Sequence, residues 1–569
     1  MTLATVALSM NWPEPRGGIM GLGRPTRRLL LGLLLLGLST WTCAANAAPP
    51  LPLDLDDSRS ALSIGEELER SGQWLDAIQH YDQALDRWPA NEDLKYGRRR
   101  ARVHFRIERR YADGSFQKSL VAMSRTQALD LFDETTTRIR ANFVEPLSYL
   151  SIVAHGTESL YIALANPEFL NENLTGALSS QQRKEGVREL RRVLREDYWN
   201  KPVHNSQHAR QVVLEVSRHA ERTLNLPASA VVMEYVFGGC NALDDYSGLL
   251  TADRLSDLYS NIDGEFVGLG VEMKEETGSG MLLVNVLPES PVAVGGLRKG
   301  DRILEIDGTD IRNATIDDAA NRMRGPSGSR VSLVVRRDAD QRTWDTVLIR
   351  RAVVVKSIPE LKIVDREHGI AYLQIAGFQK STGRELDAAL AELQSQGMKS
   401  LVIDVRGNPG GLLTAAVEVL DRLIDEGVLV STKGRTGDQN WTYRAHREGT
   451  FDMPLVLLTD GDSASASEIV AGAVRDHRRG TIVGRKTYGK WSVQSIFNIG
   501  SDNGLRLTTA KFYSPNGHTL GKIGVEPDVL VEKSTEHTVA YRSSLFGEDE
   551  SDADLDKAIE ILRRKGSSF

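Results

Sequence analysis

Residues 457–497 read LLTDGDSASASEIVAGAVRDHRRGTIVGRKTYGKWSVQSIF and decide the fold of the chain. An apolar run at 455–458 predicts a strand, and small polar residues after it predict a turn into a helix. A second strand is expected at 481–483, followed by a Gly-Lys turn and an extended segment at 491–497. The predicted helix would bury an apolar face made of Ile469, Val470, Ala473 and Val474.

The serines between the first strand and the helix have two readings. N–H groups at the start of a helix are unpaired and can hold a developing oxyanion, so a serine there suits nucleophilic chemistry. Residues 465–468 also fit the S-x-x-E capping box, which gives the serine a structural role. Three features favour chemistry over a cap: alternating alanines leave space around the hydroxyl of Ser465, and both Lys490 and Gln494 follow.

Together with GRKTYGK at 484–490, these residues resemble the signature of the carboxyl-terminal processing, or tail-specific, proteases, and the resemblance extends over 261–532. It implies that Ser465 is the nucleophile, Lys490 the general base and Gln494 the group that orients the lysine amine. The flanking serines, Ser463 and Ser467, would then be cap and helix residues.

This lysine would have to act as a base near neutral pH, although a lysine ordinarily titrates near ~10.4. Burial against apolar side chains would lower its pKa. Four extended residues span ~13 Å, so a bend near Lys490 or the reach of its side chain must close the gap to Gln494. Trp491 stands where the family usually has glycine, and its ring is expected to narrow the site or to desolvate the lysine.

Two further residues on the predicted helix carry chemistry. Asp476 matches a position that the family keeps acidic, but a continuous helix would place it ~16 Å from Ser465, so it is expected to be a supporting residue or a surface charge. His477 suggests a Ser/His/Asp triad and meets the same objection, which favours a solvated helix end.

The run SLVIDV predicts a buried strand at 400–405 and is followed by the glycine-rich residues 406–411. A phosphate cradle is disfavoured because the Gly-Lys-Ser/Thr of a P-loop is missing. The family resemblance implies an oxyanion loop instead, with the N–H of Gly411 (or Gly410) and that of Ala466 as donors. One such donor contributes ~2.7–4 kcal/mol to transition-state stabilisation.

Residues 356–535 are predicted to form an α/β catalytic core. GIAYLQIAGF predicts an alternating strand, and a helix is expected at 382–396 before the buried strand. Strands that alternate with helices predict a mainly parallel sheet with crossover helices. The resemblance implies that this core is crotonase-like.

Residues 263–355 resemble a PDZ domain. The run VLPESPVAVGGLRKGDRILEIDG at 286–308 carries the resemblance, with short strands and a helix expected around 296–300. A substrate C-terminus would add as an extra strand, its carboxylate held by backbone N–H groups of one loop. That loop comprises Gly268, Leu269, Gly270 and Val271.

Residues 1–47 predict an export signal. Three arginines precede the apolar run 29–38, and Ala-Asn-Ala at 45–47 offers a cleavage site, so a periplasmic or cell-envelope location is expected. An uncleaved membrane anchor is the alternative, and translation is expected to begin at Met20. Removing Cys43 with the leader would leave Cys240 without an intramolecular disulfide partner.

Between the signal and the PDZ-like segment the pattern is helical. Residues 58–115 resemble a tetratricopeptide (TPR) repeat, with two helices around a Pro-Ala-Asn turn, and either bind an adaptor or pack within the chain. Residues 126–262 predict a helical region in which 173–227 is longer than the usual family version. The tail, 536–569, predicts an acidic stretch, a short helix and a basic end without a readable function.

Composition excludes several functions. The 569 residues carry a net charge of −7 without a strongly basic domain, which argues against nucleic acid as a partner. Cysteines and histidines are not clustered, so neither a metal nor another cofactor is expected.

The sequence therefore predicts a multidomain α+β protein with the function of an exported serine endopeptidase. It would recognise exposed protein C-termini and form an acyl-enzyme on Ser465, with PDZ docking gating the core. Its oligomeric state stays open, a homo-oligomer included. The main alternative is a non-catalytic PDZ/TPR scaffold, and a second is a retinoid- or lipid-binding relative of the core. The intact serine, lysine and glutamine argue against both.

Overall fold

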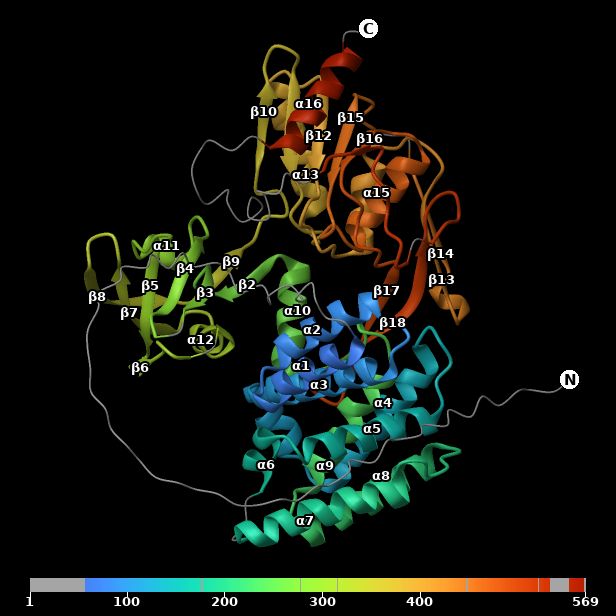
Figure 1. Cartoon of the computed structure of the whole chain (residues 1–569). Helices are drawn as coiled ribbons and strands as arrows, with labels where there is room; N and C mark the ends of the chain where they lie inside the picture. The colour runs from blue at the N-terminus through green and yellow to red at the C-terminus, as the bar shows by residue number, and fades with distance from the viewer. Residues whose placement is uncertain are drawn as a thin grey trace, which may run out of the picture. The chain divides into compact units, whose positions relative to one another are not determined.

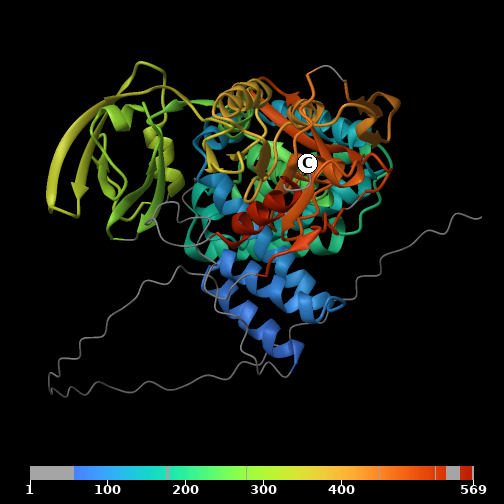
Figure 2. The same cartoon turned by 90° about the horizontal axis from the view of Figure 1, so that it is seen from above.

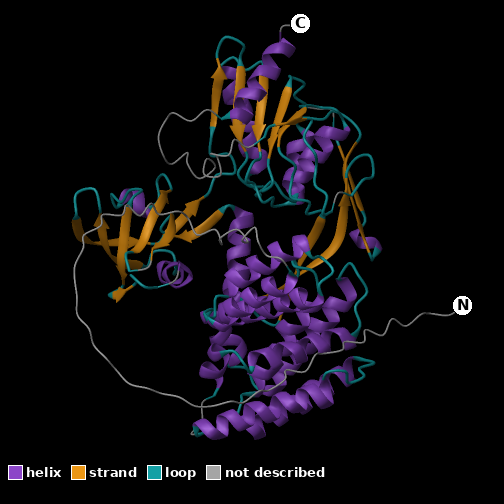
Figure 3. Ribbon diagram, in the orientation of Figure 1, coloured by secondary structure: helices purple, strands orange, loops and turns teal. Residues whose placement is uncertain are grey.

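The computed structural model describes residues 57–174, 178–276, 278–314, 316–446, 449–519, 521–532 and 552–566. They form a multidomain α+β protein, with one mostly helical region and two regions in which helices and strands are mixed (Figure 1, Figure 3). The expected signal at 1–47 lies outside the described residues, as does most of the tail apart from 552–566. Within the described ranges no helix is long and apolar enough to cross a membrane.

The first described region holds three helices where the sequence analysis expected two. Gly72 adopts a φ of 74°, which breaks the first predicted helix in two. The ring of Tyr81 packs where a Cβ on Gly65 or Gly97 would stand, so these glycines let the three helices approach closely. The helices are α1 (Ser58–Arg70), α2 (Trp74–Arg87) and α3 (Glu92–Tyr111).

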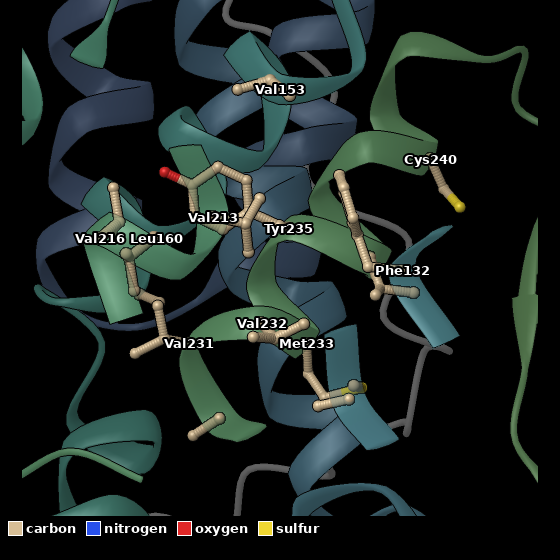
Figure 4. Close-up of a cluster of buried hydrophobic side chains, with 14 of the residues drawn as sticks. Phe132, Val153, Leu160, Val213, Val216, Val231, Val232, Met233, Tyr235 and Cys240 are labelled. Carbon is tan, nitrogen blue, oxygen red and sulfur yellow. The ribbon is translucent and has the colours of Figure 1, made fainter. Parts of the chain in front are cut away.

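The next region is helical, as predicted, and surrounds a large apolar core (Figure 4). Helices α5 and α9 pack closely because Gly156 faces Tyr235, whose ring would lie 2.5 Å from a Cβ at that glycine. The long segment 173–227 forms α7 and α8, and Val213 of α8 is buried in this core. The elements are α4 (Arg125–Asn142), α5 (Tyr149–Ala163), α6 (Pro167–Asn173), α7 (Ser180–Val193), α8 (Ser206–Leu224), α9 (Ala228–Gly239), α10 (Ala252–Asp263), the π-helical turns η1 (Phe116–Val121) and η2 (Leu194–Tyr198), and the 3₁₀ turn η3 (Cys240–Ala242).

The PDZ-like segment forms an antiparallel sheet in the order β3-β4-β5-β7-β8, with β6 beside β5, and β2 pairs with β9. The helix expected near 296–300 is wrong: Gly296 and Gly300 both have positive φ, and the short helix lies earlier. The elements are β2 (Glu265–Gly268), β3 (Val271–Glu276), β4 (Gly280–Val286), α11 (Pro291–Val294), β5 (Asp301–Ile306), β6 (Thr309–Asp310), α12 (Ile316–Met323), β7 (Arg330–Arg337), β8 (Arg342–Ile349) and β9 (Arg351–Val354).

The core contains the predicted, mainly parallel sheet, ordered β10-β11-β12-β15-β16-β19, in which the β10–β11 pair is antiparallel. The expectation that β11 alternates is wrong, because residues 370–373 are all buried. Helices cover both faces of the sheet, which requires apolar residues on each side. The strands are β10 (Leu361–Asp365), β11 (Ile370–Gln374), β12 (Ser400–Asp404), β15 (Leu455–Thr459), β16 (Thr481–Gly484) and β19 (Val529–Leu530).

Crossover helices α13, α14 and α15 share one face of this sheet, and α16 packs on the other face. The helices are α13 (Thr382–Ser395), α14 (Leu413–Asp421), α15 (Ala466–Asp476) and α16 (Ala553–Gly566). The expected helices at 382–396 and after the serine turn are confirmed.

A second, antiparallel sheet joins the helical region to the core. Its strand β1 comes from the helical region and pairs with β18, which also pairs with β13 and β17. The elements are β1 (Gly248–Leu250), β13 (Val428–Gly434), the 3₁₀ turn η4 (Gly437–Gln439), β14 (Trp441–Arg444), β17 (Ser492–Ile499) and β18 (Asn503–Tyr513). This pairing brings residues just before β1 beside the segment that contains Lys490.

Candidate active site

Ser465 occupies the turn between β15 and α15 in a strained backbone conformation. It is the N-cap of α15 and has φ 55° and ψ −110°, a region that costs a non-glycine residue ~1–3 kcal/mol. The hydroxyl groups of the two nearby serines, Ser463 and Ser467, both donate hydrogen bonds to backbone carbonyls. Ser463 is buried and donates to the carbonyl of Val405 at 2.8 Å, and Ser467 donates to the carbonyl of Asn408 at 3.0 Å. Both hydroxyls therefore hold backbone together.

A glycine loop, residues 406–411, lies against Ser465. Gly410 has φ 107°, and a Cβ there would stand 2.7 Å from the Cβ of Ser465 and 3.0 Å from the amide nitrogen of Ala466. The N–H of Gly410 donates to Oδ1 of Asn408 at 2.8 Å. Gly411, with φ 143°, approaches the carbonyl of Phe378 so closely that a Cβ would lie 2.1 Å away. Glycine is required at both positions for the loop to reach the start of α15.

Glu468 connects the serine turn to the lysine loop, defined here as residues 485–490. Its carboxylate is fully buried, and Oε2 accepts the backbone N–H of Ser465 at 2.8 Å and that of Lys490 at 2.7 Å. Oε1 accepts the N–H of Gly489 at 2.6 Å and the hydroxyl of Thr487 at 2.7 Å. The glutamate of the capping box thus fixes the backbone on both sides of the candidate site.

The ammonium group of Lys490 lies against an aromatic ring. Nζ stands 4.7 Å from the centroid of the Tyr246 ring, a cation–π contact. In the described structure no hydrogen bond joins this Nζ to the Oγ of Ser465. Burial lowers the pKa of Lys490, and the guanidinium of Arg506 lowers it further, while the carboxylates of Asp244 and Glu468 act in the opposite direction. The lysine therefore loses its proton more easily here than it would in water.

Strand pairing assembles the groups around this lysine. Gly248 of β1 is the register partner of Arg506 in β18, and Nε of Arg506 donates to the carbonyl of Tyr246 at 2.8 Å. Burial, followed by the neighbouring phenol of Tyr488, raises the pKa of Tyr246 to about 12, so its ring stays neutral. The helical region thereby supplies one wall of the lysine's surroundings.

Among the described hydrogen bonds, none joins Gln494 to Lys490. Its amide Nε2 donates to Oγ of Ser492 at 2.9 Å and to Oγ1 of Thr508 at 3.3 Å. The β17–β18 register shifts between Val493 and Gln494. The expected contact between this glutamine and the lysine amine is absent from the described hydrogen bonds, because the side chain is held by its own sheet.

The remaining residues expected on or near α15 lie away from the serine. Asp476, at the far end of α15, accepts the N–H of Asn516 at 3.0 Å and pairs with Arg475. His477 makes a 2.7 Å hydrogen bond to the carbonyl of Val428. Trp491 stacks on Phe512 with 4.6 Å between centroids and packs into the apolar core.

In the PDZ-like region, the loop of Gly268, Leu269, Gly270 and Val271 connects β2 to β3. Gly270 has φ 76°, and a Cβ there would meet Ser290 at 2.3 Å. Strand β3 is the terminal strand of its sheet and lies near α12. A peptide strand could add along this edge. Among the described residues, no group of three or more His, Cys, Asp or Glu side chains could hold a metal ion.

The sequence analysis missed Glu468 as a connector, and it missed Tyr246 and Arg506 altogether. The signal for Glu468 was present, because the S-x-x-E pattern places its carboxylate at the serine N–H. Asn408 is another fully buried connector. Its side-chain amide donates to the carbonyl of Ile375 at 2.7 Å, and its backbone carbonyl accepts the N–H of Ala464. Tyr246 gives no local signal, since it reaches the site through long-range pairing of β1 and β18.

Known proteins match the segments that carry this site. The model of peptidase family S41 matches residues 369–531, and that of the PDZ domain matches 260–336. A carboxy-terminal-processing protease of Bartonella bacilliformis is 37% identical over 314 residues, covering 54% of this chain and 71% of the relative. A carboxyl-terminal-processing protease of Picosynechococcus sp. is 35% identical over 322 residues, covering 56% of this chain and 76% of the relative.

Among solved structures, the photosystem II D1 C-terminal processing protease aligns with this chain at 23% identity and a TM-score of 0.36. The alignment covers 71% of this chain and 93% of that protein. These two relatives from Bartonella and Picosynechococcus are matched over more than two thirds of their length, and the S41 match includes both Ser465 and Lys490. The chain therefore belongs to the carboxyl-terminal-processing proteases of peptidase family S41, and it is a serine-type peptidase with a PDZ domain.

Proposed function

We propose that this protein is an exported serine endopeptidase that binds protein C-termini through its PDZ domain and cleaves them with a Ser465/Lys490 dyad. The observation that carries the proposal is the double hydrogen bond of Glu468, which fixes the backbone of both residues through one carboxylate oxygen. The strained turn at Ser465 and the buried amine of Lys490 add to it.

In this mechanism, neutral Lys490 takes the proton of the Ser465 hydroxyl while Oγ attacks the carbonyl carbon of the scissile bond. The tetrahedral oxygen would accept hydrogen bonds from the N–H groups of Gly411 and Ala466. Gly411 suits this role better than Gly410, whose N–H is engaged by Asn408. The lysine ammonium then protonates the leaving amine, and the resulting acyl-enzyme is hydrolysed by a water that the lysine deprotonates.

The contact between Lys490 and Tyr246 represents the resting arrangement in this proposal. Nζ must leave the ring and turn toward Ser465 before it can accept the proton. Gln494 must likewise leave Thr508 to orient the amine. We propose that PDZ docking of a substrate favours this change, and a core without its PDZ domain that matched the intact enzyme in activity would contradict it.

Substrate recognition would use the edge of β3. The terminal position of β3 allows a peptide to add as a strand, with its carboxylate at the N–H groups of 268–271. Proteins with exposed, apolar C-termini are the substrate class that this geometry suits.

The proposal also includes the division of the chain into domains. We assign a TPR-like, adaptor-binding unit to 58–115, the helical region to 126–262, the PDZ domain to 263–355 and a crotonase-like core to 356–535. Support for the TPR-like assignment comes from the close packing of α2 and α3, which are joined by a short turn. We also propose an export signal at 1–47 and a periplasmic or cell-envelope location.

The decisive experiment compares wild type with Ser465→Ala and Lys490→Ala on an unfolded protein that has an apolar C-terminus. Lys486→Ala is the matched control, because Lys486 lies in the same loop but is half exposed and pairs with Glu526 at 3.0 Å. We expect the control to cleave and both dyad variants to be inert but folded. Cleavage by Lys490→Ala would overturn the dyad. An inert wild type that still binds C-terminal peptides would favour the scaffold alternative.

A further inference from the structure

Helix α16 lies beyond the segment that the S41 family model covers, since the match ends at residue 531. It packs on the sheet face opposite α15, against β12, β15 and β16 (Figure 1, Figure 2). Ala558 and Leu562 are buried there. Asp552 precedes the helix, and its Oδ1 accepts the N–H of Leu555 at 3.1 Å, so the start of α16 is capped.

The start of α16 is bound by two arginines of the core. One oxygen of Asp554, Oδ2, receives Nη1 of Arg406 at 2.9 Å and Nη2 of Arg485 at 2.8 Å, and Oδ1 receives Nη1 of Arg485 at 2.9 Å. Arg406 also pairs with Asp404 at 2.7 Å and with Asp552 at 2.6 Å. The side chains of Asp404 and Asp554 are almost fully buried.

These two arginines are the first residues of the two loops that form the site. Arg406 is the first residue of the glycine loop, which continues to Gly410 against Ser465. Arg485 follows β16 directly and is the first residue of the lysine loop. Its backbone N–H donates to the carbonyl of Thr459 at 2.9 Å. Asp554 therefore bridges the bases of both loops with one buried carboxylate.

The charges explain why this bridge is specific. Arg406 keeps Asp404 as a partner without α16, but Asp554 is the carboxylate that the structure places on Arg485. Two guanidinium groups that share a carboxylate are drawn together, whereas without it they would repel each other in a buried setting. Bidentate pairing also fixes the orientation of Arg485, which a single hydrogen bond would not do.

We propose that α16 is a positioning element of the active site, in which Asp554 holds the glycine loop and the lysine loop in register through Arg406 and Arg485. Asp554 acts through these arginines and touches neither the substrate nor the reacting atoms. The inference rests on the proposed dyad, because the register matters for Ser465 and Lys490. The C-terminal helix thereby becomes part of the machinery that sets kcat.

The test compares Asp554→Asn with Asp556→Asn, whose residue lies on the same helix but is exposed. Steady-state cleavage is measured on the full chain at one temperature that lies well below the Tm of every variant. We expect Asp554→Asn to lower kcat about ten-fold or more with KM nearly unchanged, since small misplacements at a site cost up to about 10²-fold. Asp556→Asn should match wild type, and Asp554→Glu should recover part of the loss. A kcat for Asp554→Asn equal to that of Asp556→Asn would overturn the proposal, as would an increase in KM without a fall in kcat.

Arg485→Lys keeps the test decisive if Asp554→Asn does not fold. Lysine retains the charge but cannot form the bidentate pair, so we expect a smaller fall in kcat, about three-fold or more. An unchanged kcat in this variant would also overturn the positioning role. Ser465→Ala, measured alongside, separates the two proposals. Residual cleavage by Ser465→Ala would contradict the dyad. The ratio of the kcat of Asp554→Asn to that of Asp556→Asn reports on the positioning role of α16.

Discussion

One carboxylate oxygen, Oε2 of Glu468, accepts the backbone N–H groups of both Ser465 and Lys490, at 2.8 and 2.7 Å. The serine and the lysine are brought together by β15, α15 and β16 and then held by a glutamate that lies between their main chains. Such a buried charge is stable because four donors surround it. Its loss should affect geometry and stability together.

We therefore expect Glu468→Gln to lower both the stability of the fold and the catalytic rate. In the wild type, two carboxylate oxygens accept hydrogen bonds from four donors. A glutamine keeps only one acceptor oxygen, and its NH₂ group, itself a donor, would face two of those donors without forming a hydrogen bond. Losing a hydrogen bond to a buried charged group costs about 1.5–3 kcal/mol, which a lowered Tm would show. Cleavage kinetics should show a fall in kcat of about 10²-fold.

The control for this variant is Glu392→Gln on the exposed side of α13. It removes the same charge at a site where the carboxylate accepts a hydrogen bond from Gln396 in solvent. Tm and kcat should stay at wild-type values. Full activity in Glu468→Gln would show that the connection through this carboxylate is dispensable.

The pH dependence of cleavage should report the surroundings of Lys490. In the proposed mechanism the lysine acts as a base in its neutral form, and both burial and Arg506 lower its pKa. Activity should therefore rise with pH through a pKa below the ordinary lysine value. Replacing Arg506 by Gln removes a positive charge, so the pKa of Lys490 should rise and the ascending limb of kcat/KM should move to higher pH.

Lys511→Gln is the comparison, because Lys511 lies on the same strand, is half exposed and stands 3.7 Å from Glu145. Its pH profile should coincide with that of wild type. Activity of Arg506→Gln should be low at neutral pH and recover at higher pH, which a purely structural defect would not produce. A shift of the limb toward lower pH would contradict the assignment of Lys490 as the base.

Tyr246 should restrain the lysine in the resting arrangement. A cation–π contact is worth about 0.5–2 kcal/mol, so Tyr246→Leu, which keeps an apolar wall without a ring, should raise basal cleavage by about two-fold to thirty-fold. Tyr246→Phe retains the ring face and should behave like wild type. Reduced cleavage in the leucine variant with normal activity in the phenylalanine variant would mean that the ring supports catalysis instead of restraining it.

Local pattern was enough to predict the elements around Ser465. The period of apolar residues correctly identifies Ile469 and Val470 as buried residues of α15, although the helix is buried all round from Ala466 to Val474. The strands on either side follow from short β-rich runs. The same reasoning could not find Tyr246 or Arg506, because the pairing of β1 with β18 joins segments that are far apart in the chain. Sequence motifs place residues along the chain, whereas these contacts depend on which strands become neighbours.

Gln494 shows the converse limit. A motif placed it close to Lys490 in sequence, but a shift of the β17 register turns its amide toward Thr508. The extra helix break at Gly72 and the buried second face of β11 were missed for related reasons. The first depends on one positive φ, and the second on α16, which packs from the end of the chain.

The last prediction concerns the close approach of the glycine loop to the serine. Gly410 combines a φ of 107° with a Cα so near Ser465 that a Cβ would stand 2.7 Å from the serine Cβ. Gly410→Ala must therefore move the loop away from the start of α15 or shift Ser465. Gly410 is buried, but its neighbours Pro409 and Gly411 are exposed and can shift with the loop, so we expect a folded protein whose kcat falls about 10²-fold or more. Gly437→Ala is the matched control, since nothing lies within 4 Å of a Cβ at that glycine and its φ is not positive. Cleavage kinetics and Tm measured on both variants decide the matter: wild-type kcat in Gly410→Ala would mean that the oxyanion is held elsewhere than between this loop and the N–H of Ala466.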